Sequence, residues 1–309
     1  MTNLSGWKQP VLSLLLFAAT AIVSPAQTFT TLVQFNYTDG AFPHAISLIQ
    51  GTDGNLYGTT YVGGKYHGGT IFKVTTGGTL TTLRSFYGPN GVHPWAGVIQ
   101  ATDGSLYGTT EGMINGGPPV NWYGSIFNLN LAGDVLTTLY QFCAPSCVDG
   151  SEPHAGLVQA SNGDFYGTTT WGGADGVGTV FEITAGGTLT TLHSFDGGDG
   201  ANPYAGLVQG SDGNFYGTTY AGGTNSDGTI FEITPAGSLT TLYSFCSQAG
   251  CTDGAYPWGG LLQASDGNFY GTTVNGGIKV DCTLCGSNGE GTIFSLSVGL
   301  GPVAKKGAN

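Results

Sequence analysis

Two glutamates are the only acidic residues at two recurring positions of the sequence. Glu111 follows a Tyr-Gly-Thr-Thr string, and Glu152 precedes a proline. The other copies carry Tyr61, Thr170, Tyr220 and Val274 at the first position and Phe42, His93, Asn202 and Tyr256 at the second. Two carboxyl groups about 5 to 9.5 Å apart can cleave a glycosidic bond. Glu111 and Glu152 are therefore candidate catalytic residues of a glycan-cleaving site, with neutral drift as the simpler explanation.

The residue after that proline carries a ring in every copy. These five residues are His44, Trp95, His154, Tyr204 and Trp258. If the loops that carry them surround the mouth of a central channel, their flat faces would suit sugar rings or other planar ligands. Packing between repeats, next to a turn proline, explains the same pattern equally well. We take the five as candidate ligand-binding residues with that alternative left open.

Other chemistries lack the residues that they need. The net charge is -12 and Arg84 is the only arginine, which argues against nucleic acid as a partner and against a sialidase. The five histidines show no metal-ligand spacing. The glycines belong to turns and not to a phosphate-binding or dinucleotide-binding loop. We therefore expect no metal site, no cofactor and no nucleic-acid partner.

Internal repeats indicate the elements that would position these residues. The string Tyr-Gly-Thr-Thr begins at Tyr57, Tyr107, Tyr166, Tyr216 and Tyr270, at intervals of 50, 59, 50 and 54 residues. Each copy has short runs rich in Thr, Ile, Val, Tyr and Phe, and an Asp-Gly or Asn-Gly pair separates the first two, as in a hairpin. No stretch after residue 26 shows a helical period. Four antiparallel strands per copy at this spacing predict the blade of a β-propeller.

The two ends of the repeated region predict how such a ring closes. The fifth copy stops after its third run, at residues 291–296, and a match to the missing fourth run occurs at Phe29–Phe35. The N-terminal strand would complete the last blade and remove the free sheet edges. We therefore predict an all-β fold, a five-bladed β-propeller over residues 27–300. An open β-solenoid is the alternative, but it gives no reason for a split repeat.

The repeated frame resembles a known family. Its most regular copy reads Gly-Leu-Val-Gln, Ser-Asp-Gly-Asn-Phe-Tyr-Gly-Thr-Thr, Gly-Thr-Ile-Phe-Glu-Ile-Thr and Leu-Thr-Thr-Leu between residues 206 and 242. This frame is similar to that of the GloVer tandem-repeat proteins, over roughly residues 28 to 300. The resemblance implies an exported bacterial protein with a propeller-like fold. It implies no activity, because the family is defined by its repeats.

The N-terminal segment is typical of a secretory signal peptide over residues 1–26. Lys8 provides the positive charge, residues 11–23 are apolar, and Ser24-Pro25-Ala26 offers small residues for cleavage. The apolar run is short for a bilayer span, so cleavage is preferred to an uncleaved anchor. We expect a secreted, extracellular protein with no membrane span after cleavage. Residues 301–309 would form a short tail.

Six cysteines occur as three close pairs. They are Cys143 with Cys147, Cys246 with Cys251, and Cys282 with Cys285. An even number of cysteines in an exported chain predicts disulfides. A zinc site that uses Cys282 and Cys285 is the alternative for the last pair, because so short a loop restricts disulfide geometry.

These observations favour a secreted, non-enzymatic repeat protein. Its partner would be a polysaccharide or another cell-surface polymer, bound through the ring-bearing residues on one face. A glycan-cleaving enzyme that uses Glu111 and Glu152 is the second hypothesis, and a protein-interaction or structural module is the third. The propeller fold by itself does not distinguish among them.

Overall fold

The computed structural model describes residues 28–43, 47–112, 123–143, 146–278 and 289–303. Every element considered below lies in the unit that begins at Leu32. The predicted signal peptide at residues 1–26, the ring-bearing residue His44, and the pair Cys282 and Cys285 lie outside the described residues.

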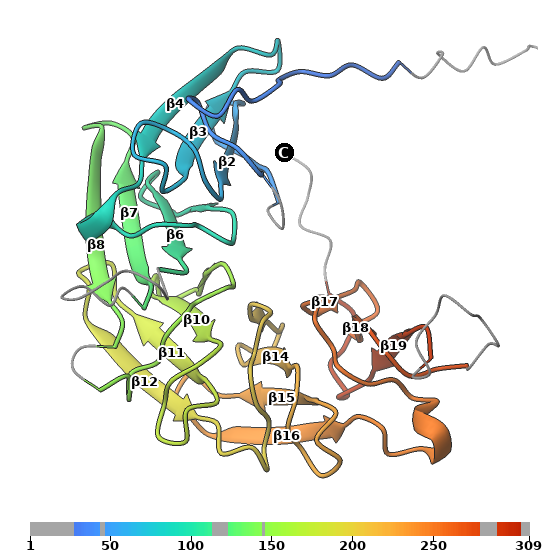
Figure 1. Cartoon of the computed structure of the whole chain (residues 1–309). Helices are drawn as coiled ribbons and strands as arrows, with labels where there is room; N and C mark the ends of the chain where they lie inside the picture. Colours follow the sequence, from blue (N-terminus) through green and yellow to red (C-terminus); the bar gives the residue numbers. More distant parts are fainter. Residues whose placement is uncertain (1–27, 44–46, 113–122, 144–145, 279–288, 304–309) are drawn as a thin grey trace, which may run out of the picture. The chain divides into compact units, whose positions relative to one another are not determined.

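The described part of the chain forms five antiparallel sheets in which sequence order equals spatial order (Figure 1). The first two sheets contain β1 (Ile49–Gln50), β2 (Leu56–Thr60), β3 (Thr70–Val74) and β4 (Leu80–Ser85), then β5 (Ile99–Gln100), β6 (Leu106–Thr110), β7 (Ser125–Asn130) and β8 (Val135–Gln141). The third and fourth contain β9 (Val158–Gln159), β10 (Phe165–Thr169), β11 (Thr179–Ile183) and β12 (Leu189–Ser194), then β13 (Val208–Gln209), β14 (Phe215–Thr219), β15 (Thr229–Ile233) and β16 (Leu239–Ser244). The fifth contains β17 (Leu262–Gln263), β18 (Phe269–Thr273) and β19 (Thr292–Leu296). Two 3-10 turns, Gly88–Asn90 and Ala249–Cys251, are the only helical segments in the described residues.

The all-β prediction is confirmed, and each predicted repeat forms one sheet. The hairpin between the first two strands of each sheet contains the predicted Asp-Gly or Asn-Gly pair, with its glycine at a φ of 80° to 93°. Only glycine adopts this left-handed backbone without strain, which explains why it recurs there. Tyr57, the second residue of β2, anchors the first of these hairpins, since its hydroxyl donates to Asp53. Tyr107, Tyr216 and Tyr270 donate to their own hairpin aspartates in the same way.

A glycine and a phenylalanine on neighbouring strands form a matched pair in every sheet. In the fourth sheet Gly217 of β14 lies opposite Phe231 of β15. A Cβ atom on Gly217 would sit 2.6 Å from the Cζ atom of Phe231. The glycines of the other Tyr-Gly-Thr-Thr strings face Phe72, Phe127, Phe181 and Phe294 in the same way. The string therefore needs glycine because the ring of the next strand fills the space above it.

Polar side chains join each sheet to the next. The recurring threonine at the third position of the string donates to a backbone carbonyl of the following repeat in the first four copies, for example Thr109 to Ala155 at 2.8 Å. The recurring glutamines make the structural hydrogen bonds that their repetition predicts. Gln159, for instance, accepts from the Thr102 amide of the preceding sheet and donates to its own hairpin at Gly163.

The core lies between neighbouring sheets and is largely aromatic. Tyr107 stacks on Phe165 of the next sheet at 4.1 Å, and Tyr166 stacks on Phe215 at 4.0 Å. One buried cluster, for example, combines Tyr107 and Ile126 of the second sheet with residues of the third. Burial of these large rings supplies the main stabilisation of such a repeat, because apolar area removed from water is worth about 25 cal/mol per Å².

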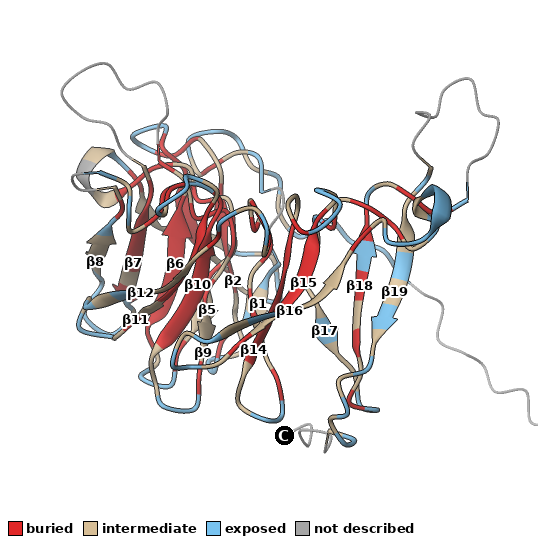
Figure 2. Cartoon of the chain, turned by 90° about the horizontal axis from the view of Figure 1, so that it is seen from below, coloured by how far each residue is buried: buried red, intermediate tan, exposed pale blue. Residues whose placement is uncertain are grey.

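The fifth sheet has three strands, as the truncated fifth repeat predicts, but the N-terminal strand that would complete it is not formed. Residues 28–36 adopt no strand, and β19 is an edge strand. Figure 2 shows β19 with exposed segments where β6 and β10 are buried. Ile293 is 82% exposed, whereas the equivalent Ile230 of β15 is 2% exposed. Closure of the ring therefore stays a prediction.

Two of the three predicted cysteine pairs are disulfides. Cys143 is bonded to Cys147, and Cys246 is bonded to Cys251. Within the described residues, no helix has the length and apolar character needed to cross a bilayer.

Candidate functional site

A repeated corner of the backbone positions the candidate site residues. The residue before the recurring proline has a left-handed φ, between 54° and 58°, at Phe42, His93, Glu152, Asn202 and Tyr256. Because all five repeats share this geometry, the corner belongs to the scaffold. The carbonyl of this residue accepts the amide that follows the Tyr-Gly-Thr-Thr strand of its own repeat, as in the bond from Glu111 N to His93 O. The two variable positions of the sequence are therefore neighbours in space.

The ring-bearing residues contact one another from one repeat to the next. The ring centroids of Trp95 and His154 are 5.3 Å apart, those of His154 and Tyr204 are 5.4 Å apart, and Tyr204 stacks on Trp258 at 4.2 Å. At the first end Tyr61 meets the edge of Trp95 at 5.4 Å. We name this series, Tyr61, Trp95, His154, Tyr204 and Trp258, the aromatic arc. Packing between repeats, the alternative reading of the sequence, therefore does occur along it.

The aromatic arc is buried in its middle and exposed at one end. His154 is 9% exposed, whereas Trp258 is 47% exposed. Trp95 and Tyr204 are half-buried. Tyr220 adds a second ring beside the exposed end, because it meets both Tyr204 and Trp258 edge to face. The exposed end, at Trp258, therefore offers an aromatic surface to a ligand. The middle of the arc, at His154, is shielded from water.

Glu111 and Glu152 converge on His154 in that shielded middle. One ligand atom from each of the three side chains lies within 4.8 Å of the other two. The Tyr61 hydroxyl donates to Glu111 at 3.0 Å, and His154 Nε2 lies 3.5 Å from the other oxygen of Glu111. The carboxyl groups are thus closer than the separation of about 6.5 to 9.5 Å that an inverting glycosidase uses, and nearer the value of about 5 to 5.5 Å in a retaining one.

The two carboxyl groups have different electrostatic surroundings. Burial would raise the pKa of Glu111, but the neighbouring His154 and the Tyr61 hydroxyl lower it by more, so that it lies below its ordinary value. Burial raises the pKa of Glu152, and the charge of Glu111 adds to this effect against the attraction of His154. Burial and the charge of Glu111 also raise the pKa of Tyr61 to about 12, so its hydroxyl stays a donor. Acid–base pairs in enzymes show such opposite shifts.

Two residues of this site were not selected from the sequence, although both stand at the variable positions. Tyr61 bonds to Glu111, and His93 stacks on Tyr61 at 4.7 Å. The two variable positions of one repeat are joined by a backbone hydrogen bond, and this bond could have pointed to both residues. Residue types alone do not reveal such a bond.

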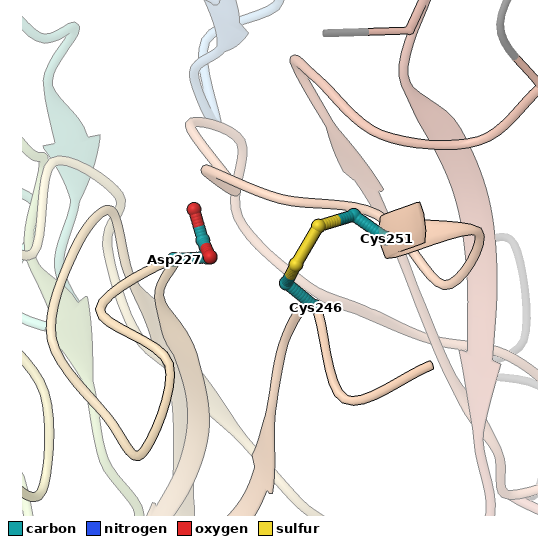
Figure 3. A group of neighbouring side chains, drawn as sticks. All are labelled: Asp227, Cys246 and Cys251. Carbon is teal, nitrogen blue, oxygen red and sulfur yellow. A yellow bond between two sulfur atoms is a disulfide. The ribbon is translucent and has the colours of Figure 1, made fainter. Parts of the chain in front are cut away.

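A second group of potential ligands lies beside a disulfide. Figure 3 shows Asp227 with Cys246 and Cys251, whose sulfur atoms are bonded to each other. Thiolates bind metals and disulfide sulfurs do so poorly. We therefore do not treat this group as a metal centre.

Residues 19–210 and 112–305 match the Gloeobacter/Verrucomicrobia repeat in two overlapping stretches. None of the curated proteins matches. Among solved structures, a luciferin-regenerating enzyme is 14% identical, with 83% of this chain and 79% of that chain covered and a TM-score of 0.50. This likeness concerns the fold alone and agrees with a β-propeller-like arrangement of the sheets.

Two further solved structures are less similar. A gluconolactonase from Xanthomonas campestris is 13% identical over 72% of this chain and 67% of that chain, with a TM-score of 0.47. TolB from Acinetobacter baumannii is 16% identical over 74% of this chain, with a TM-score of 0.45, and the match spans 48% of TolB.

The repeat match covers nearly all of the described residues, and the frame that it recognises recurs as one antiparallel sheet per copy. The chain belongs to the Gloeobacter/Verrucomicrobia (GloVer) repeat family.

Proposed function

We propose that this protein is an exported, five-bladed β-propeller that binds carbohydrate through the exposed end of the aromatic arc. The observation that carries the proposal is the stack of Tyr204 on Trp258, with ring planes 10° apart and Trp258 47% exposed. Stacking on Tyr204 fixes the Trp258 ring in one orientation, so the exposed part of Trp258 offers a rigid surface that loses little entropy when a ligand binds. Sugar rings present the complementary apolar face.

The charge of the protein narrows the class of carbohydrate. Lys and Arg together number 7 against 19 Asp and Glu. Polyanionic glycans would therefore be repelled at long range. Neutral polysaccharides fit best, with Glu152, Asn202 and Tyr220 near the arc as polar groups for sugar hydroxyls.

The proposal includes export and a closed ring. Export is supported by the signal-like residues 1–26 and by the two disulfides, which persist in oxidising compartments. Closure is supported by the N-terminal segment: Phe35 meets Phe72 at 5.1 Å, as Phe86 meets Phe127 and Phe245 meets Phe294 across other sheet pairs. Phe35 thus already occupies the place of a fourth-strand phenylalanine next to the first sheet.

The test is calorimetric titration of the mature protein with soluble neutral polysaccharides, with product analysis of the same samples. We expect saturable binding that weakens at least about tenfold in Trp258→Ala, since a stacking partner is lost. The matched control is Tyr87→Ala, because Tyr87 is 45% exposed and pairs with Tyr66 instead of the arc. Equal losses in both variants, or no binding to any glycan, would overturn the proposal.

The convergence of Glu111 and Glu152 supports a second candidate function, cleavage of the bound glycan. Product analysis separates the two functions. New reducing ends that disappear in Glu152→Gln would identify an enzyme. Binding without new reducing ends favours the non-enzymatic function.

A further inference from the structure

Glu111, Glu152 and His154 bring two carboxylates and one imidazole together from two adjacent repeats. Glu111 directly follows β6, while Glu152 and His154 flank Pro153 in the loop that leads to β9. The side chains of Glu111 and His154 are 11% and 9% exposed. Among the described residues, no lysine or arginine forms an ion pair with either carboxyl group. Within the part of the chain that the structure describes, the negative charge of this group therefore has no lysine or arginine to balance it.

Hydrogen bonding fixes the orientation and the proton of His154. Its Nδ1 atom lies 2.7 Å from the Thr170 hydroxyl, and that hydroxyl lies 3.3 Å from the Pro203 carbonyl oxygen. A carbonyl oxygen can only accept, so the Thr170 proton points to Pro203 and the Thr170 oxygen accepts from Nδ1–H. In the neutral ring the lone pair is then on Nε2, the nitrogen that lies 3.5 Å from Glu111 and is free to bind a metal ion; without a metal, protonation of Nε2 lets it face the carboxylate as a donor. Metal-binding histidines are held in this way, by a bond from the other ring nitrogen.

The separation of the facing atoms fits an ion better than a direct hydrogen bond. His154 Nε2 and the nearest Glu111 oxygen are 3.5 Å apart. N–H···O bonds to a carboxylate are usually about 2.7 to 2.9 Å long. Two ligand atoms at tetrahedral angles, each about 2.1 Å from a zinc ion, lie about 3.4 Å apart. The third ligand atom, from Glu152, is within 4.8 Å of both, so a rotation of its side chain completes the set.

We propose that Glu111, Glu152 and His154 form a binding site for one divalent transition-metal ion, with Zn²⁺ preferred over Mn²⁺. An imidazole nitrogen with two carboxylates suits these ions, and Zn²⁺ follows Mn²⁺ in the order of increasing affinity. Three protein ligands leave one position of a tetrahedral ion for water or another oxygen ligand. This site does not depend on the identity of any carbohydrate ligand.

The test is calorimetric titration of tag-free, chelator-treated mature protein with Zn²⁺ and, separately, with Mn²⁺. We expect one Zn²⁺ per chain and weaker binding of Mn²⁺. Glu152→Gln should lower Zn²⁺ affinity at least about tenfold, and Thr170→Val, which removes the partner of Nδ1, should lower it about 10- to 100-fold. Thr170→Val touches no metal ligand atom, so its effect reports the positioning of His154.

His193→Gln is the matched control, because His193 also faces a carboxylate, at 2.6 Å from Asp199, but lies outside the cluster. It should retain one Zn²⁺ at unchanged affinity. Circular dichroism confirms that each variant is folded. Absence of one-to-one Zn²⁺ binding in the wild type, or equal affinity in the wild type and Glu152→Gln, would overturn the site. Because no glycan is present, this result is independent of carbohydrate binding.

Discussion

At the scale of single residues, aspartates organise the loops that lead into each sheet. Asp253 accepts the Tyr243 hydroxyl at 2.7 Å and the Ser247 amide at 2.9 Å, and so ties the end of β16 to the Cys246–Cys251 loop. Asp149 accepts the Tyr140 hydroxyl in the same way, and Asp199 pairs with His193. These three acids, which precede the first strands of their repeats, are therefore loop anchors, and each pairs with a residue of the preceding outer strand.

This anchoring predicts a specific pH dependence of stability. Burial would raise the pKa of Asp253, but the bonds from Tyr243 and Ser247 lower it by more, so that it lies below the ordinary value of 3.8. A group whose pKa is lower in the folded than in the unfolded state stabilises the fold above its unfolded pKa. Its contribution disappears as the pH falls through the folded pKa. We expect Asp253→Asn to lower the melting temperature at pH 7 and to have less effect near pH 2.

Thermal unfolding followed by circular dichroism between pH 2 and pH 7 measures this difference. Asp175→Asn is the control, because Asp175 is an exposed loop residue, and its melting temperatures should follow the wild type throughout. A constant difference between Asp253→Asn and the wild type at every pH would mean that the charge of Asp253 contributes nothing.

At the scale of elements, each sheet is assembled around the contact between its second and third strands. Gly217 lies opposite Phe231, and a Cβ atom there would be 2.6 Å from the phenylalanine ring. Phe231 is fully buried and also meets Phe195 of the preceding sheet at 5.2 Å. The ring therefore has no free space to move away, and the contact connects strand pairing with the packing of neighbouring sheets.

We therefore expect Gly217→Ala to destabilise the fold by about 1 to 3 kcal/mol, the usual cost of one extra carbon in a full core. Phe231→Leu in the same chain should restore part of that loss, because the shorter side chain leaves room for the methyl group. Urea denaturation of both variants measures these effects. Gly186→Ala is a matched control, since its Cβ would be 3.7 Å from the nearest atom. Additive losses in the double variant would contradict the paired contact.

The elements were largely predictable from the sequence, and the candidate site was only partly so. Strands and hairpins follow local patterns, and five copies of one frame make each pattern unambiguous. Glu111 and Glu152 were identifiable as exceptions to the frame. Their convergence on His154 was not, because it depends on how two consecutive repeats pack. Tyr61 was missed for the same reason, since its bond to Glu111 joins residues that are 50 positions apart.

At the scale of the whole molecule, the fifth sheet differs from the other four because its third strand, β19, has no described fourth strand beside it. Ile293 of β19 is exposed, while Ile71, Ile126, Val180 and Ile230 are buried at the same position. A groove beside β19 is lined by Tyr243, Phe245, Ile293 and Phe294. An apolar edge strand of this kind is a template for another strand. The chain itself contains the matching segment.

Residues 32–35 are already held next to the first sheet as a fourth strand would be. The carbonyl oxygen of Leu32 would be 2.9 Å from a Cβ atom on Gly78. The fourth-strand residues Leu139 and Leu192 approach Gly187 and Gly237 of the following sheets in the same way. Only the pairing with β19 is missing. In the complete third sheet Val180 pairs with His193, so the same register would place Val33 opposite Ile293.

Closure of the ring therefore predicts a disulfide between Val33→Cys and Ile293→Cys. Directly opposed residues of antiparallel strands have Cβ atoms about 4.5 to 5.5 Å apart, close enough for sulfur atoms to bond with small adjustments. The variant is best made with Cys282 and Cys285 replaced by serine, so that the new cysteines pair only with each other. Under oxidising conditions we expect an intramolecular cross-link, identified by mass spectrometry of the joined peptides.

The control separates a specific register from chance contact. Val33→Cys with Ser295→Cys places the second cysteine two residues further along β19, where diagonal neighbours are about 7 to 8 Å apart or more, so this pair should cross-link poorly. Equal cross-linking of both pairs would indicate a disordered segment. A cross-link between two chains, visible as a dimer on a non-reducing gel, would show instead that β19 accepts the N-terminal segment of another molecule. An intramolecular bond confined to residues 33 and 293 is the outcome that a closed five-bladed ring requires, because only closure brings the first and last repeats into one sheet.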